Sequence, residues 1–320
     1  MKFGLIGHPI EHSLSPALFR AGYGGRYPYD LIQTDSFEEA YRRFIEGYDG
    51  INVTAPFKEP ALAKADIVTE ECRLVGASNL LMKTPEGITA YNSDYRGLCV
   101  WLRELLERSE EAGSDKSVLP PWPQGVGPTT QSWEGFFCHS QPPLTVQQSE
   151  RNVLIVGMGG AGKAAAAAAW STGISLTLMN RDMSKAEEMA CRLRMENKSK
   201  DSGCRTEDEE GDRKIETRPL SDFCECFRKA DIIIYNLPVR LPELDGLTTQ
   251  DFQSTSGVKH ILEANYRNPS FNARLLKRMK EANPRAEYTP GQTWLLLQAV
   301  TGYEIFTGER PDLSAMSAQI

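Results

Sequence analysis

Asn152-Val-Leu-Ile-Val-Gly-Met-Gly-Gly-Ala-Gly162 joins an apolar run to a glycine-rich turn. Consecutive Val, Leu and Ile residues are typical of a buried parallel strand. The glycines at 157, 159 and 162 follow at once with the spacing G-x-G-x-x-G, and six alanines, 164–169, then predict a helix that lies close to a sheet. A strand, this turn and a helix in succession predict a Rossmann-type, doubly wound dinucleotide-binding domain.

The turn offers a place for the pyrophosphate of a dinucleotide. Gly157 permits the tight turn, and Gly159 lets the backbone approach a ligand. Gly160, Ala161 and Gly162 open the helix, whose N-terminus presents free N–H groups to an anion. The alternative is a glycine turn that packs without any ligand.

A second predicted strand, residues 175–180, ends in the residues that choose between NAD and NADP. Asn180 and Arg181 stand where NAD sites usually have an acidic residue, and Lys185 follows. Two cations there favour the 2′-phosphate of NADP, since a guanidinium can bind phosphate with two hydrogen bonds. Asp182 would repel that phosphate, which leaves NAD possible.

The rest of the chain extends this alternation of strands and helices. Residues 1–106 predict a second α/β unit, with a hairpin at Pro85-Glu-Gly87 and a helix start capped by Ser93 or Asp94. Residues 107–150 hold six prolines and five glutamines, and predict a linker or insertion that is either a disordered spacer or partly packed on the body. We therefore expect an α/β protein of two domains: a substrate-binding domain from 1–106 and 288–320, and a Rossmann-type domain from 151–287.

Composition narrows the kind of ligand. The chain has 320 residues, 40% of them hydrophobic, and a net charge of −7, which disfavours nucleic acid and acidic membrane surfaces. No apolar run is long enough to span a bilayer. Seven scattered cysteines suit a reducing cytoplasm, and the only close pair, Cys224-Glu-Cys226, lacks further metal ligands nearby. We expect a cytoplasmic protein with a small-molecule substrate and no metal, as a monomer or a homodimer.

Two polar motifs in the first third of the chain supply a lysine and a carboxylate. They are Asn52-Val-Thr-Ala-Pro-Phe-Lys58 and Asn92-Ser-Asp94. Hydride transfer to a ketone builds negative charge on the carbonyl oxygen, and an ammonium group placed there both neutralises the charge and delivers a proton. Beside a dinucleotide domain, these motifs indicate an oxidoreductase.

In sequence order, the motifs resemble those of shikimate dehydrogenase. The matching blocks are Gly7-His-Pro-Ile-Glu-His-Ser-Leu-Ser-Pro16, Asn52–Lys58, Gly76-Ala-Ser-Asn79, Asn92–Asp94 and Gln298. The resemblance covers most of the chain outside 107–150 and 196–214. It implies reduction of 3-dehydroshikimate to shikimate with NADPH, a step of the shikimate pathway towards chorismate and the aromatic amino acids.

The resemblance also assigns roles to individual residues. It implies that Lys58 is the acid/base and that Asp94 is its partner. The substrate-binding residues that it implies are Ser13, Ser15, Thr54, Asn79, Tyr266 and Gln298, and Gly291 falls on the cofactor side. Purely structural roles are the alternative. Lys58 would then be an exposed surface residue, and Ser13 and Ser15 would cap a helix. Asn79 would belong to a turn, and Gln298 would be a hydrogen-bonded amide in the core.

The chain departs from the family pattern on the nucleotide side. Tyr235-Asn-Leu-Pro-Val-Arg240 replaces a family stretch that has a threonine and a glycine, and Glu263 replaces an aspartate. Two other functions therefore stay open. One is an NAD-dependent quinate/shikimate dehydrogenase, and the other is a non-catalytic sensor that binds shikimate-like ligands without a cofactor.

Overall fold

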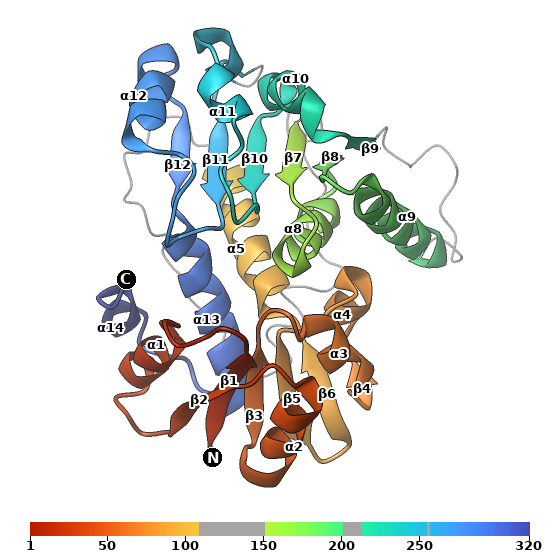
Figure 1. Ribbon diagram of the computed structural model, residues 1–320, viewed down its shortest axis with the longest axis vertical. Coiled ribbons are helices and arrows are strands. Elements are labelled where there is room, and N and C mark those ends of the chain that lie inside the picture. The colour runs from red at the N-terminus through yellow and green to blue at the C-terminus, as the bar shows by residue number, and fades with distance from the viewer. Residues whose placement is uncertain (109–150, 201–212, 255–256) are drawn as a thin grey trace. The chain divides into compact units, whose positions relative to one another are not determined.

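The computed structural model describes residues 1–108, 151–200, 213–254 and 257–320 (Figure 1). The chain divides into two compact units, Met1–Pro143 with Leu295–Ile320, and Leu144–Trp294. The predicted linker or insertion at 107–150 lies almost entirely outside the described residues, as does most of the charged stretch at 196–214.

The first unit contains a mixed sheet of six strands in the order β2-β1-β3-β5-β6-β4 (Figure 1). Its strands are β1 Phe3–Gly7, β2 Tyr29–Gln33, β3 Gly50–Val53, β4 Ile67–Val68, β5 Leu80–Thr84 and β6 Gly87–Tyr91. Strand β1 runs parallel to β2 and β3, whereas β5 is antiparallel to both β3 and β6. The predicted hairpin is confirmed, since Thr84 of β5 pairs with Gly87 of β6.

Helices cover both faces of this sheet. They are α1 Ser15–Gly22, α2 Phe37–Gly47, α3 Lys58–Ala63, α4 Glu70–Val75, α5 Ser93–Arg108, α13 Gly291–Thr307 and α14 Leu313–Ser317. Strand residues alternate between the faces, so Ile51 packs with Phe44 of α2, while Phe3 packs with Phe306 of α13. Helices α2 to α4 thus cover one face, and α1 and α13 cover the other.

The start of α5 corrects one detail of the prediction. Neither Ser93 nor Asp94 is the cap. The side-chain oxygen of Asn92 accepts a hydrogen bond from the Tyr95 N–H at 3.0 Å, which is the bond that an N-cap residue makes. Asp94 therefore lies inside the first turn of the helix.

The second unit is a parallel sheet of six strands in the order β12-β11-β10-β7-β8-β9 (Figure 1). Its strands are β7 Asn152–Val156, β8 Ser175–Met179, β9 Ile215–Arg218, β10 Ile232–Tyr235, β11 His260–Glu263 and β12 Glu287–Thr289. All five pairings are parallel. The order reverses between β7 and β10, as in a doubly wound fold, and the predicted fold class is confirmed.

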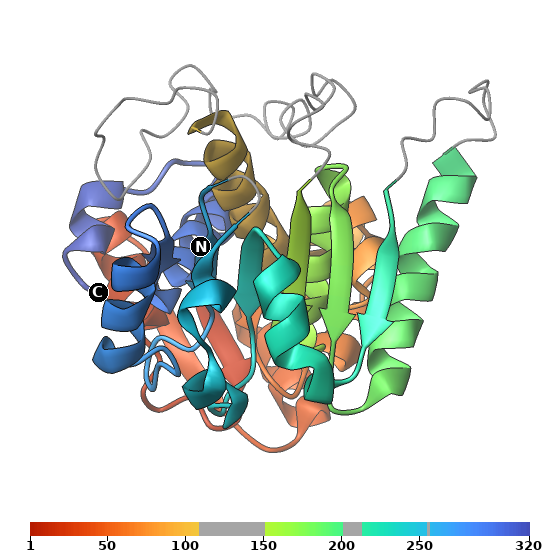
Figure 2. The same ribbon diagram turned by 90° about the horizontal axis from the view of Figure 1, so that it is seen from above.

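The helices of this unit are α8 Gly160–Ser171, α9 Met183–Lys200, α10 Phe223–Lys229, α11 Glu243–Gly246 and α12 Ala273–Ala282. Figure 2 shows α10, α11 and α12 on one face of the sheet and α8 on the opposite face. Leu154 and Val156 of β7 pack into the core beneath α10 to α12. The alanines at 164–169 are all fully buried, so α8 lies as close to the sheet as their small side chains predict.

One buried cation supports the second sheet. Lys259, just before β11, is 0% exposed, and its Nζ donates to the carbonyl oxygens of Phe227 and Ala230 at 2.6 and 2.7 Å. These carbonyls belong to the C-terminal end of α10, where an ammonium group is favoured by the helix dipole. Burial nevertheless lowers the pKa of Lys259 to about 8.

Candidate functional site

One edge of the first sheet gathers the polar motifs. Strands β1 and β3 are parallel, so their carboxyl ends meet at this edge. Strand β5 is antiparallel, and its first residue, Leu80, pairs with Asn52 near the end of β3 and with Tyr91 at the end of β6. Segments that follow β1, β3 and β6, and the segment that precedes β5, are therefore neighbours. These segments carry Ser13, Ser15, Thr54, Lys58, Asn79 and Asp94.

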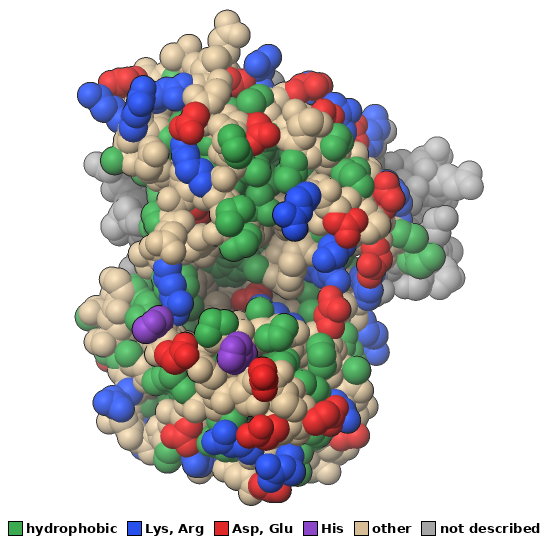
Figure 3. Space-filling view, viewed as in Figure 1, with side chains coloured by type: hydrophobic (Ala, Val, Ile, Leu, Met, Phe, Trp, Pro, Cys, Tyr) green, Lys and Arg blue, Asp and Glu red, His purple; other side chains and the backbone are tan. Residues whose placement is uncertain are grey.

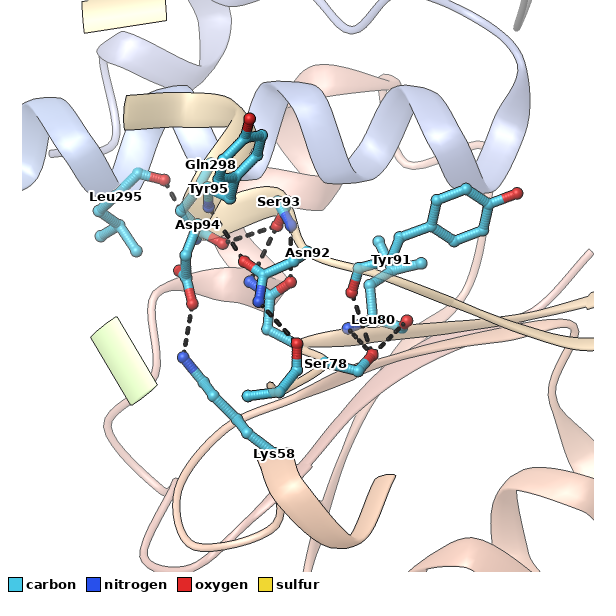
Figure 4. Close-up of polar contacts among 12 residues, drawn as sticks. Lys58, Ser78, Leu80, Tyr91, Asn92, Ser93, Asp94, Tyr95, Leu295 and Gln298 are labelled. Carbon is cyan, nitrogen blue, oxygen red and sulfur yellow. Dashed lines mark hydrogen bonds and ion pairs between the residues drawn. The ribbon is translucent and has the colours of Figure 1, made fainter. Parts of the chain in front are cut away.

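Lys58 and Asp94 form an ion pair at this edge (Figure 4). The Lys58 Nζ lies 2.5 Å from the Asp94 Oδ2, and the two side chains are 17% and 12% exposed. A charge-assisted hydrogen bond of this length, largely screened from water, holds the ammonium group in one place. The reading of Lys58 as an exposed surface lysine is wrong.

The helix that carries Asp94 is fixed by amide side chains (Figure 4). Asn92 caps α5 and also donates to the Ala77 carbonyl at 2.9 Å. Asn79 accepts from the Ser93 N–H at 2.7 Å and donates to the Ser93 Oγ at 3.0 Å. Asp94 in the first turn also lies near the positive end of the helix dipole, where a carboxylate is stabilised.

Gln298 of α13 joins this group through Ser93, whose Oγ donates to the Gln298 Oε1 at 3.3 Å. The two helices approach closely because Gly97 of α5 has no side chain. A Cβ atom there would lie 2.7 Å from the Gln298 backbone nitrogen, and one at Gly302 would lie 3.0 Å from the Ser93 Oγ. Sequence reasoning missed both glycines, since neither belongs to a turn or a nucleotide motif.

The segments after β1 and β3 pack together. A Cβ atom on Gly7 would lie 2.3 Å from the Thr54 Cγ2, and the His8 N–H donates to the Ala55 carbonyl at 3.2 Å. The Ser13 Oγ donates to the Ser15 Oγ at 3.2 Å. Neither serine is the N-cap of α1, because that position is Leu14, which makes no side-chain capping bond. The Ser13 Oγ does, however, accept a hydrogen bond from the Ser15 N–H at 3.2 Å, and so it engages the first N–H of α1.

Tyr266 differs from the other predicted substrate residues because it belongs to the second unit. It follows β11, is partly buried, and has the Arg267 guanidinium 5.6 Å from its ring centroid.

The glycine-rich turn of the second unit has the conformation that its sequence predicts. Gly157 has φ of +97°, a value that few other residues adopt. A Cβ atom on Gly162 would lie 1.7 Å from the Gly157 carbonyl oxygen, so the third residue of α8 must be glycine. A Cβ atom on Gly159, by contrast, would meet nothing within 4 Å. The open side of the turn leaves room for a ligand above Gly159.

Asn180 connects this turn to the end of β8. Its Oδ1 accepts from the Met158 N–H at 3.2 Å, and its Nδ2 donates to the Asp182 carbonyl at 2.9 Å. The Asp182 carboxylate accepts from the Ser184 N–H at 3.1 Å and from the Ser184 Oγ at 2.7 Å, and the side-chain bond lowers the pKa of Asp182. Asp182 thus has a structural use in the first turn of α9.

Arg181 and Lys185 flank that turn as exposed cations. Within the described part of the chain, no hydrogen bond or ion pair engages either side chain. Both side chains are available to an anionic group. A guanidinium and an ammonium group at the end of β8 fit the 2′-phosphate of NADP.

The segment at the end of β10 that departs from the family pattern, residues 235–240, is held by hydrogen bonds of Tyr235 and Arg240. The Tyr235 hydroxyl donates to the Val239 carbonyl at 2.8 Å and accepts from the Leu241 N–H at 3.0 Å. Arg240 contacts the Asp245 carboxylate at 2.5 Å and also donates to the Ser270 carbonyl. The Asn236 Oδ1 is buried and has no hydrogen-bond donor among the described residues.

Glu263, the last residue of β11, and Gly291, the first residue of α13, are tightly packed within the second unit. The Glu263 carboxylate is fully buried and accepts from the Phe271 N–H at 3.2 Å and the Tyr288 hydroxyl at 2.9 Å. A Cβ atom on Gly291 would lie 2.6 Å from the Ala264 carbonyl oxygen. Gly291 is therefore required for packing at the start of α13, and its role towards a cofactor stays a prediction.

Charges of both signs are interspersed over the visible face of each unit (Figure 3). The described residues include no group of three or more His, Cys, Asp and Glu side chains that could hold a metal ion. Among the helices that the structure describes, none is long and apolar enough to cross a membrane.

Comparison with known proteins gives a consistent result. Residues 5–81 match the model of the shikimate dehydrogenase substrate binding domain. A protein named shikimate dehydrogenase (NADP(+)) from Caldanaerobacter subterraneus is 26% identical over 96% of this chain and 91% of its own length. One of the same name from Rubrobacter xylanophilus is 29% identical over 98% and 93%. The chain therefore resembles shikimate dehydrogenases over almost its whole length.

A solved structure shares the fold. Quinate dehydrogenase from Corynebacterium glutamicum, determined in complex with NAD, has a TM-score of 0.69 and 21% identity, with 100% of this chain and 98% of that chain covered. At this identity the likeness shows a common fold only.

Proposed function

We propose that this chain is an NADP-dependent shikimate dehydrogenase, which reduces 3-dehydroshikimate to shikimate with NADPH. The observation that carries the proposal is the Lys58–Asp94 ion pair, 2.5 Å long and mostly shielded from solvent at the edge of the first sheet. The names of relatives that align with almost the whole chain support the substrate and the cofactor.

The chemistry of the site follows from that pair. When bound, NADPH supplies the hydride. Reduction of the ketone leaves negative charge on its oxygen, and the Lys58 ammonium group stabilises this charge and then donates the proton. Asp94 holds the ammonium group in place through its hydrogen bond. An acid/base group of this kind contributes roughly 10²–10⁴ to the rate.

The other residues of the edge bind the substrate in this proposal. Ser13, Ser15 and Thr54 offer hydroxyl groups to the substrate carboxylate. Tyr266, which belongs to the second unit, is kept as a further proposed substrate-binding residue. Asn79 and Gln298 face the ring hydroxyls with amide groups, which can both donate and accept. Asn79 already uses its oxygen and one N–H on Ser93, so it retains one N–H for the substrate.

The cofactor belongs to the second unit. The turn from Gly157 to Gly162 takes the pyrophosphate, and Arg181 and Lys185 take the 2′-phosphate. Asn180 connects the glycine turn to the segment after β8 through its hydrogen bonds to Met158 and Asp182. We propose that Gly291 also contributes to the cofactor site. We assign residues 1–106 and 295–320, in the first unit, to a substrate-binding domain and residues 151–294, in the second, to an NADP-binding domain. The boundary lies after Trp294 and not at residue 288, because β12 pairs with β11 and Gly291 packs against Ala264.

Replacement of the lysine tests this assignment. We expect Lys58→Ala to lower kcat at least a hundredfold while NADPH affinity stays nearly unchanged, since the amine is needed for proton transfer and lies in the other unit. Lys64→Ala is the matched control, because Lys64 ends the same helix and is exposed. Near-normal turnover in Lys58→Ala would remove Lys58 from the mechanism.

An NAD-dependent quinate/shikimate dehydrogenase is the second candidate. The shared fold with a quinate dehydrogenase makes it compatible, and Asp182 adds a negative charge where the NADP phosphate would bind. The cations at 181 and 185, and the structural use of Asp182 in α9, favour NADP. A sensor without catalysis is disfavoured by the intact Lys58–Asp94 pair.

We infer a cytoplasmic protein with small-molecule ligands, either monomeric or homodimeric. The net charge of −7 and the scattered cysteines support this inference. All five cysteines in the described residues are free thiols.

A further inference from the structure

Two tyrosine hydroxyls lie behind the edge of the first sheet that carries the site. Tyr303 of α13 is 2% exposed, and its Oη donates to the Ser15 carbonyl oxygen at 3.0 Å. Tyr29, the first residue of β2, donates from its Oη to the Asn52 Oδ1 at 2.8 Å. The two rings meet edge to face with centroids 6.0 Å apart, and both contact Phe19.

The hydroxyls are unexpected at these positions. The cluster around them also contains Phe3 and Phe306, whose rings stack at a centroid distance of 4.7 Å. Phenylalanine would fill the same space without the cost of removing a hydroxyl from water, which is offset only when the hydroxyl finds a partner. Each tyrosine hydroxyl has found one, and each partner is a residue of the site edge.

The bond from Tyr29 fixes the orientation of an amide. Asn52 is 8% exposed and lies two residues before Thr54. Its oxygen accepts from Tyr29, so the side chain cannot turn over without losing this bond, and its Nδ2 must point the other way. Among the described residues, none accepts a hydrogen bond from that Nδ2, which leaves both N–H groups for a ligand.

The bond from Tyr303 fixes the start of α1. It holds the backbone carbonyl of Ser15, whose hydroxyl accepts from Ser13 at 3.2 Å. Tyr303 lies on the same helix as Gln298, so the bond links two sides of the site. Burial raises the pKa of Tyr29 and Tyr303, and both hydroxyls therefore stay protonated and able to donate.

We propose that Tyr29 and Tyr303 are positioning residues for the substrate carboxylate. Through Asn52 and Ser15, they hold N–H and O–H donors in the direction of that anionic group. This inference rests on the proposed function, since it takes the substrate to be a shikimate-like carboxylate. Neither tyrosine touches the reacting atoms, so both act on substrate affinity rather than on the hydride or proton step.

Removal of single hydroxyl groups tests the inference. Tyr29→Phe and Tyr303→Phe keep the rings, and Tyr27→Phe is the matched control, since Tyr27 belongs to the same cluster but donates to Glu309 at 3.0 Å. We expect the KM and the calorimetric Kd for shikimate to rise about tenfold in each of the first two variants. We expect kcat to stay within about twofold and the KM for NADP⁺ to stay unchanged. Tyr27→Phe should match the wild type.

Other outcomes overturn the inference. A purely structural role for the tyrosines would change kcat, the KM for NADP⁺ and the unfolding midpoint together. Unchanged shikimate affinity in active Tyr29→Phe and Tyr303→Phe variants would reject the positioning role and leave the dehydrogenase intact. If the wild type binds shikimate without reducing NADP⁺, the proposed function fails. The positioning role is then tested by the shikimate Kd values of Tyr29→Phe and Tyr303→Phe, and values equal to that of the wild type reject it. A wild type that neither binds nor oxidises shikimate overturns both.

Discussion

At the scale of single residues, two oppositely charged side chains carry the proposed chemistry. Lys58 and Asp94 are 36 positions apart in the sequence, yet their charged atoms lie 2.5 Å apart. Motifs made both residues candidates, and the register of β3, β5 and β6 explains why they meet. Other residues gave no such signal. Tyr29 and Tyr303 look like ordinary aromatic core residues in the sequence, because only the folded chain shows which atoms their hydroxyls reach.

Cofactor choice is also decided by single residues. We expect Arg181→Ala and Lys185→Ala each to raise the KM for NADP⁺ about tenfold, with little change in the KM for NAD⁺, because only NADP⁺ carries the 2′-phosphate. Arg192→Ala is the control, since Arg192 lies on α9, the helix that carries Lys185, but pairs with Glu188. Equal effects on both cofactors would place the two cations away from the 2′ position.

At the scale of helices and strands, local sequence patterns predicted most elements, while their contacts depend on tertiary packing. The glycine-rich turn indicated the β7–α8 unit, and alternating apolar residues with a glycine turn indicated the β5–β6 hairpin. The cap of α5 was predicted one or two residues late. Asn92 holds that position because its amide also bonds to Ala77, a contact from another segment that no local pattern contains.

The close approach of α5 and α13 gives a test at this scale. We expect Gly97→Ala to lower the free energy of unfolding by about 1–3 kcal/mol, because the new methyl group would meet the backbone of Gln298 at 2.7 Å. Shikimate turnover should fall as well, since Asp94 and Gln298 lie on these two helices. Gly47→Ala is the control, because a Cβ there meets nothing within 4 Å. Chemical denaturation of the three proteins measures the difference, and equal stability of all three would contradict the close packing.

The support of α10 by Lys259 gives a second test. We expect Lys259→Met to destabilise the protein by about 1–3 kcal/mol, because it leaves buried carbonyl groups of α10 without a donor. Lys229→Ala, an exposed lysine at the end of the same helix, should cost far less.

The stability contribution of Lys259 should also depend on pH. Its pKa is about 8 in the fold and 10.5 ordinarily, so between these values the unfolded chain binds the proton and the folded protein does not. Stability therefore rises with pH across this window in the wild type, and this rise should be absent in Lys259→Met. If both proteins follow the same pH curve between 8 and 10, the buried amine remains charged.

At the scale of the whole molecule, the chain separates two chemical tasks. The first unit gathers the lysine, the carboxylate and the small polar side chains at one sheet edge, and the second provides a glycine turn with two exposed cations. The doubly wound architecture was predicted from residues 152–162 together with the strand that follows at 175–180, since few other folds need that succession of strand, glycine turn, helix and strand. The altered segment after β10 could not be interpreted from sequence, because its order depends on the Tyr235 hydroxyl and on Arg240.

The most direct measurement is absorbance at 340 nm while the purified wild-type protein is supplied with shikimate or quinate and with NADP⁺ or NAD⁺. We predict reduction of NADP⁺ with shikimate, at a kcat/KM well above that of the other three pairs. Preference for NAD⁺ with quinate would replace the proposed activity by the second candidate. Absence of reduction with every pair, for a folded protein that binds shikimate in calorimetry, would contradict the dehydrogenase assignment.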